Sequence, residues 1–133
     1  MCDYQRGTFE CRGDGYLWDA DDDGWDPNET DYPCPRCNTA VYLAEAKEEA
    51  ESTLSGGNIC HSYTGLSLWE GAVAWARKQN EKAALEALVA LSPIAALSPS
   101  DELDYKKTGT YKKSILQYAA DGSDECTVVV VTD

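Results

Sequence analysis

Residues 32–39 read YPCPRCNT and hold the most specific motif of the chain. The Cys34-Pro-Arg-Cys37 spacing is typical of a tight turn that presents two thiolates to one metal ion, with backbone amides supporting the sulfurs. Structural zinc takes four ligands in a tetrahedron, so this turn supplies half of a site. The motif therefore predicts a metal-pinned region whose other two ligands come from elsewhere in the chain.

The missing ligands are expected upstream, where CDYQRG at residues 2–7 has the form of a second Cys-x-x-Cys-x-Gly turn. Gln5 stands in the place of the second Cys, and Cys11, six residues later, can supply that thiolate. Cys60 and His61 in NICHSY are alternative ligands, and reduced thiols without metal are the alternative state. The predicted zinc ligands are Cys2, Cys11, Cys34 and Cys37.

These two turns resemble zinc-ribbon modules and the knuckles of J-domain cochaperones, which carry CxxCxGxG repeats. The resemblance covers about the first 40 residues and is most specific at Cys34 and Cys37. It implies one structural zinc ion. A redox function for the pair is disfavoured, because a redox motif opens a helix after a strand and DPNETDYP at residues 26–33 is no strand.

The chain is predicted to form a single α+β domain over residues 1–133. Its parts are a zinc-pinned region of loops and short strands (1–40), a helical region (41–105) and a β-hairpin (106–133). In the first part, abundant Gly and Pro predict loops, with TFEC and GYLW as two facing short strands. In the last part, YKKSILQY and CTVVVVT flank a turn and predict the hairpin, although the first of them also fits a helix.

Apolar residues at helical spacing predict a helix between Asn38 or Thr39, as its cap, and the Gly56-Gly57 pair. The outer face of this helix is rich in glutamate. Its buried face is expected to carry Leu43, Ala46, Ala50 and Leu54.

A second helical stretch is predicted from Ser67, which has capping-box spacing to Glu70, as far as Leu91. It is either one long helix or two helices, the second of which begins at Asn80. Pro99 in SPSDELDY is expected at the first position of a further helix.

The chain is strongly acidic, since 24 Asp and Glu against 11 Lys and Arg give a formal net charge of −13. Residues 1–37 alone hold ten acidic residues and three Arg, a formal charge of −7. Direct binding to nucleic acid needs clustered Lys and Arg, which this sequence lacks. The expected partner is a basic surface on another protein, because opposite charge attracts it and speeds the encounter.

The acidity is concentrated in DADDDGWDPNE at residues 19–29, for which a calcium loop, a solvated loop and a recognition surface are the three interpretations. DADDDG matches the opening of an EF-hand loop, but Pro27 and Thr30 occupy its later positions, so calcium is disfavoured. Six of the twelve Trp and Tyr residues lie within the first 42 positions, which favours a surface that contacts a protein. The predicted partner-binding residues are Asp19, Asp21, Asp22, Asp23, Trp25, Asp26 and Glu29.

The sequence shows no nucleophile–base set and no Gly-rich phosphate loop, so an enzyme is not expected. It also shows no leader peptide and no apolar stretch long enough to span a membrane, which predicts a cytoplasmic protein with reduced thiols. In that setting, Cys126 is expected to be a small buried apolar side chain.

In size, acidity and aromatic content the chain is similar to phage-encoded anti-CRISPR and anti-restriction proteins that mimic DNA. This resemblance implies a non-catalytic inhibitor that occupies the basic nucleic-acid site of a nuclease or surveillance complex in the cytoplasm of a bacterial host. The alternatives are a zinc-ribbon adaptor that contacts another protein through its helices, and a calcium-binding module.

Overall fold

The computed structural model describes residues 2–21, 24, 28–53, 55–57, 62–99, 111–120 and 125–132. These residues form helices together with small antiparallel sheets, which confirms the predicted α+β class and the helical middle. In chain order the elements are β1 (Gln5–Arg6), β2 (Phe9–Cys11), β3 (Leu17–Asp19), α1 (Thr39–Ser52), β4 (Ser55–Gly57), β5 (Ser62–Thr64), α2 (Gly65–Gln79), α3 (Glu81–Leu91), β6 (Ile94–Pro99), β7 (Tyr111–Tyr118) and β8 (Cys126–Thr132).

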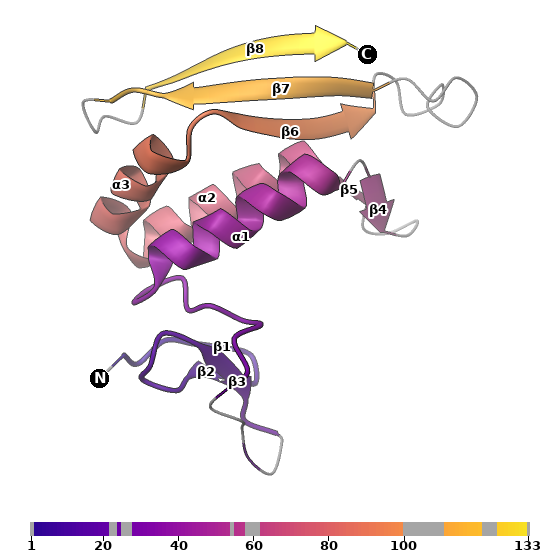
Figure 1. Cartoon of the computed structure of the whole chain (residues 1–133). Coiled ribbons are helices and arrows are strands. Elements are labelled where there is room, and N and C mark those ends of the chain that lie inside the picture. Colours follow the sequence, from indigo (N-terminus) through magenta and orange to yellow (C-terminus); the bar gives the residue numbers. More distant parts are fainter. Residues whose placement is uncertain are drawn as a thin grey trace.

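The three helices lie between two sheets (Figure 1). At one end is the sheet β1-β2-β3, and at the other is the sheet β6-β7-β8. β6 packs on α1 and α2, whereas β8 is the strand of that sheet farthest from the helices. The short hairpin β4-β5 joins α1 to α2 and contacts β6.

The N-terminal module, residues 2–37, is organised by the sheet β1-β2-β3, in which Glu10 pairs with Trp18. β2 and β3 confirm the two facing strands predicted from TFEC and GYLW. Gly15 has a φ of 94°, which favours glycine, and its carbonyl accepts both the Cys34 amide at 2.8 Å and Asn38 Nδ2 at 3.0 Å. The module is thereby tied to the start of α1.

α1 begins at Thr39, as predicted, with Asn38 as its N-cap residue. The Asn38 side chain makes no cap bond, and its Nδ2 donates to the Gly15 carbonyl of the module. The helix ends at Ser52, earlier than predicted, since residues 55–57 belong to β4. Leu43 and Ala50 are buried and Ala46 packs on the core, as expected, while Leu54 lies outside the described residues.

α2 begins at Gly65, two residues before the predicted start. The capping box is formed by Thr64 and Ser67: the Ser67 amide donates to Thr64 Oγ1 at 3.1 Å, and the Thr64 amide donates to Ser67 Oγ at 2.8 Å. The predicted capping box of Ser67 and Glu70 is therefore wrong. Asn80 interrupts the helical stretch and accepts the Ala83 amide at 3.3 Å through its side chain. The stretch is therefore two helices, which meet at Asn80.

The C-terminal hairpin is confirmed by β7 and β8, and the helical alternative for YKKSILQY is wrong. The predicted helix start at Pro99 is also wrong, because Pro99 ends β6, which pairs along β7. An edge strand tolerates Pro, and the alternation of buried Ile94 and Ala96 gives β6 an inward face. The rest of SPSDELDY lies outside the described residues. Cys126, expected to be buried, is exposed at the start of β8.

The core lies between the helices and the inner face of the C-terminal sheet. Trp69 is completely buried and donates its Nε1 hydrogen to the Tyr118 hydroxyl at 3.2 Å, which joins α2 to β7. Glu51 accepts the Ala95 amide at 3.0 Å and joins α1 to β6. The buried core residues are Leu43, Ala50, Trp69, Ala76, Ala84, Ala87, Leu88, Ile94, Ala96 and Leu116.

Two glycines of α2 form a matched pair for testing how tightly α2 packs on α1. A Cβ at Gly65 would overlap the carbonyl oxygens of Ala50 and Thr53, so Gly65→Ala should lower the free energy of unfolding by about 2 kcal/mol or more. A Cβ at Gly71 meets nothing within 4 Å, so Gly71→Ala should raise that free energy by up to about 1 kcal/mol. Urea denaturation measures both, and equal changes in the two variants would contradict the packing described.

Candidate metal centre

Four cysteines of the N-terminal module converge on one point. Cys2 precedes β1, Cys11 ends β2, and the other two flank the turn before α1. Their sulfur atoms all lie within 4.8 Å of one another. The predicted ligand set, Cys2, Cys11, Cys34 and Cys37, is thus brought together.

The spacing of the sulfurs fits a tetrahedral metal ion. Cys2 Sγ lies 3.7 Å from Cys34 Sγ, and Cys11 Sγ lies 3.6 Å from Cys37 Sγ. An ion with metal–sulfur bonds of about 2.3 Å spaces its four sulfurs about 3.8 Å apart. A disulfide would bring two sulfurs to about 2.05 Å, so the four cysteines are free thiols. The cluster could therefore hold a metal such as zinc.

Backbone amides support the sulfurs, as the sequence motif predicted. The Gly13 amide donates to Cys11 Sγ at 3.3 Å. Burial raises the pKa of the Cys34 thiol, and backbone hydrogen bonds from Cys37 and Arg36 oppose this rise. N–H groups directed at a sulfur stabilise the thiolate, which is the form that binds metal.

Burial also raises the pKa of the Cys37 thiol far above its ordinary value, and hydrogen bonds with the neighbouring thiols of Cys11, Cys34 and Cys2 raise it further. Negative charge is thus costly among four sulfurs that lie so close together. A divalent cation at their centre would reverse this cost, because its charge stabilises all four thiolates at once.

The module is docked on α2 by contacts that the sequence did not reveal. Tyr4 is buried, and its hydroxyl accepts the Nε1 hydrogen of Trp75 at 2.9 Å. Arg36 donates to Gln79 Oε1 at 3.2 Å and 2.8 Å, and its carbonyl accepts Asn80 Nδ2 at 3.1 Å. The helical pattern alone could not identify Trp75 as an anchor, because a half-buried aromatic is equally compatible with a core position.

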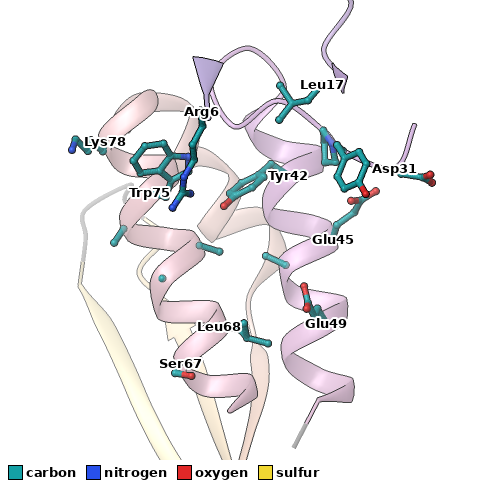
Figure 2. A pocket seen from close by; sticks show the side chains of 16 residues that line it. Arg6, Leu17, Asp31, Tyr42, Glu45, Glu49, Ser67, Leu68, Trp75 and Lys78 are labelled. Atoms are coloured by element: carbon teal, nitrogen blue, oxygen red, sulfur yellow. The ribbon is translucent and has the colours of Figure 1, made fainter. Parts of the chain in front are cut away.

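A groove of about 670 Å³ opens between the module, α1 and α2 (Figure 2). Its lining includes small side chains, among them Ala46 and Ala72. Sequence analysis missed the groove, because its walls come from three separate segments. The run of Gly and Ala along α2 was the one available signal.

The two sides of the groove carry opposite charge. On the α1 side are Glu45 and Glu49, with Asp31 beside them, and on the α2 side are Arg6 and Lys78 (Figure 2). Both cations make cation–π contacts with the ring of Trp75, with Arg6 Cζ at 4.4 Å and Lys78 Nζ at 5.6 Å from its centroid. Among the described residues, the carboxylates on the α1 side form no ion pair. Burial, and then the charges of Glu48 and Asp31, raise the pKa of Glu45.

The other residues predicted for the site fall into two groups. Asp19 lies in β3 and accepts the Asp21 amide at 3.0 Å, and Glu29 is exposed. The remaining predicted residues lie outside the described part of the chain, and they are Asp22, Asp23, Trp25, Asp26, Cys60 and His61.

Comparison with known proteins gives no family: no family model matches the chain, and no curated protein or solved structure is significantly similar to it. Within the described residues, no helix has both the length and the apolar character that crossing a membrane requires.

Cys34→Ser and Cys126→Ser test the metal centre as a matched pair. Cys34 is buried in the cluster, whereas Cys126 is exposed on β8 and far from it. Because groups that merely hydrogen-bond to zinc ligands already change affinity about 10–100-fold, Cys34→Ser should weaken zinc binding by more than about 100-fold. Cys126→Ser should leave it unchanged. Zinc content after dialysis against a graded chelator series is the measurement, and equal retention by both variants would contradict the assignment.

Proposed function

We propose that this protein is a non-catalytic interaction module, stabilised by one structural zinc ion, that binds a basic segment of a partner protein in the groove between α1 and α2. The supporting observation is the groove itself, in which aromatic rings lie beside the carboxylates of Asp31, Glu45 and Glu49, and burial and neighbouring acidic charges raise the pKa of Glu45. Zinc acts here through the fold, and binding takes place at the groove.

The zinc assignment follows from the donor set. Four cysteine thiolates complete the tetrahedron and leave no open position for water or substrate, which is typical of structural zinc. Zinc would join the start of the chain to β2 and to the turn before α1. It would thereby hold Leu17 and Tyr32 of the module over the helices, where both line the groove.

The carboxylates of the groove and the negative net charge of the chain favour a basic partner. Glu45 is close enough to Glu48 and Asp31 for their charges to raise its pKa, so a cation placed among them would relieve repulsion as well as form new ion pairs. The net charge of −13 adds long-range attraction for such a partner. These terms favour a Lys or Arg of the partner on the α1 side of the groove.

The aromatic rings and the small residues of the groove favour a large apolar side chain next to that Lys or Arg in the partner. Tyr42 and Trp75 are half-buried and face the groove, so they offer contact area with little loss of side-chain freedom (Figure 2). Gly71 and the alanines also line the groove, and their small size leaves room for a large side chain. The preferred ligand is a peptide segment in which Lys or Arg lies next to Trp, Phe or Leu.

The predicted recognition segment at residues 19–29 would extend this acidic surface. Asp31, which follows that segment closely in the chain, raises the pKa of Glu45 on α1 through its charge. If the partner's basic surface is itself a nucleic-acid site, binding there gives inhibition of the anti-CRISPR or anti-restriction type. That narrower function stays a prediction, based on charge.

A random peptide library displayed on phage and selected against the zinc-loaded protein should yield sequences with Lys or Arg next to an aromatic or Leu residue. The double variant Glu45→Lys/Glu49→Lys should weaken binding of a selected peptide by at least about tenfold, because it reverses charge on the groove wall. Calorimetry at low and high salt measures this, and affinity should fall with salt.

The matched control is Glu70→Lys/Glu86→Lys, which makes the same change of charge at exposed positions outside the groove. This control should keep peptide affinity within about twofold of wild type, since exposed charges that do not line the groove are screened by solvent and salt. Selected peptides that lack basic residues, or an equal loss in both double variants, would rule out recognition at the groove.

The inhibitor hypothesis has a separate test in DNA cleavage by purified Cas nucleases and restriction enzymes. The protein should inhibit one of them at about equimolar amounts, because it would occupy the DNA site directly. Asp21→Lys/Asp22→Lys/Asp23→Lys should abolish that inhibition without loss of the folded circular dichroism spectrum. Full inhibition by the triple variant would eliminate the mimic.

A further inference from the structure

The C-terminal strand β8 is an edge with nothing on its outer side within the described residues. The sheet has the order β6-β7-β8, so β8 pairs with β7 alone. Alternate backbone N–H and C=O groups of an edge strand point away from its neighbour and are free to pair with another strand.

The opposite edge of the same sheet is covered. β6 packs on α1 and α2, and the amide of Ala95 donates to the Glu51 carboxylate at 3.0 Å. β8 lies on the far side of β7, away from the helices (Figure 1). The two edges therefore differ, and β8 is the one open to another chain.

The four valines of β8 are exposed, two on each face of the sheet. Val128, Val129, Val130 and Val131 have exposed fractions of 53%, 55%, 56% and 47%. Successive residues of a strand point to opposite faces, so neither face of β8 is covered. On β7, the residues paired with Val130 and Val128 are Ser114 and Leu116, and both are buried. The helices therefore cover β7 but do not extend over β8.

The sequence of β8 lacks the features that normally protect an edge. Natural edge strands carry a charge, a Pro or a bulge that prevents pairing with another chain. CTVVVVT has no charge and no Pro, although the chain as a whole carries −13. A seven-residue strand of this composition is suited to pairing.

We propose that β8 pairs antiparallel with β8 of a second copy of this chain, across a two-fold axis at Val129, and forms one continuous six-stranded sheet. In this register Val129 faces Val129 of the second copy, and Val128 faces Val130, so valine contacts valine throughout the centre. A symmetric contact of this kind needs one self-complementary patch, which an uncharged strand provides.

Charge favours a second copy joined at this edge over contact at other surfaces. Two chains of −13 repel each other, so a stable contact must keep their acidic surfaces apart. β8 lies at the opposite end of the molecule from the module, whose residues 1–37 carry −7 (Figure 1). A single strand pair is small against the roughly 800 Å² per partner of stable complexes, so the dimer should be reversible, with a micromolar Kd.

Sedimentation velocity of the full-length, zinc-loaded protein over a concentration series tests this dimer. Wild type should pass from monomer to dimer as concentration rises, and Val129→Lys should raise the Kd at least about tenfold, because it places two like charges opposite each other at the axis. Val41→Lys is the matched control: Val41 is 37% exposed on α1, so the same substitution there should leave the Kd unchanged.

Hydrogen exchange of wild type gives a second measurement that needs no variant. Amides of β8 that face β7 should be protected at all concentrations, whereas the alternate amides on the outer edge should become protected only as the dimer forms. A monomer at all concentrations up to about 1 mM would overturn the proposal. So would a dimer that Val129→Lys leaves intact, or one that both variants weaken equally. The Val129→Lys variant should still bind peptide at the groove, so loss of the dimer and loss of groove binding can be measured independently.

Discussion

The N-terminal module depends on one constraint, the convergence of four cysteine sulfurs within 4.8 Å. Among its described residues, few side chains are buried, Tyr4 and Cys34 among them, and its strands are two or three residues long. So small an apolar core cannot offset the conformational entropy of ordering the loops. A metal ion shared by the four cysteines would supply what the core does not, because binding energy at such a site is also folding energy.

The groove is a consequence of where that module docks. Tyr4 and Arg36 contact the C-terminal part of α2 and the α2–α3 junction, and the same docking places Leu17 and Asp31 over the gap between the helices. The cysteine cluster therefore acts on the groove at a distance, through the position of the module. The cations on one side are held by Trp75, which leaves the carboxylates of α1 as the side that can gain from a new partner.

The two proposed surfaces lie at different parts of the molecule and have opposite character. The groove has an acidic side on α1 and lies next to the module, whereas β8 is uncharged and at the far edge of the C-terminal sheet. Pairing at β8 would leave both grooves of a dimer open. Two linked grooves would raise the apparent affinity for a partner with repeated basic segments, because the second binding event becomes intramolecular.

Local signals in the sequence predicted the Cys34-x-x-Cys37 turn, α1 and the hairpin β7-β8, and they left the break at Asn80 as one of two alternatives. Each depends on residues close together in the chain: the Cys34-x-x-Cys37 turn, apolar spacing, a capping side chain and a turn between two β-prone runs. Tertiary structure alone decided β6, the exposure of Cys126 and the groove. Pro99 signals a helix start locally, but pairing with β7 and packing on α1 outweigh that signal. Whether Cys126 is buried depends on how far the helical layer extends across the sheet, which no single segment encodes.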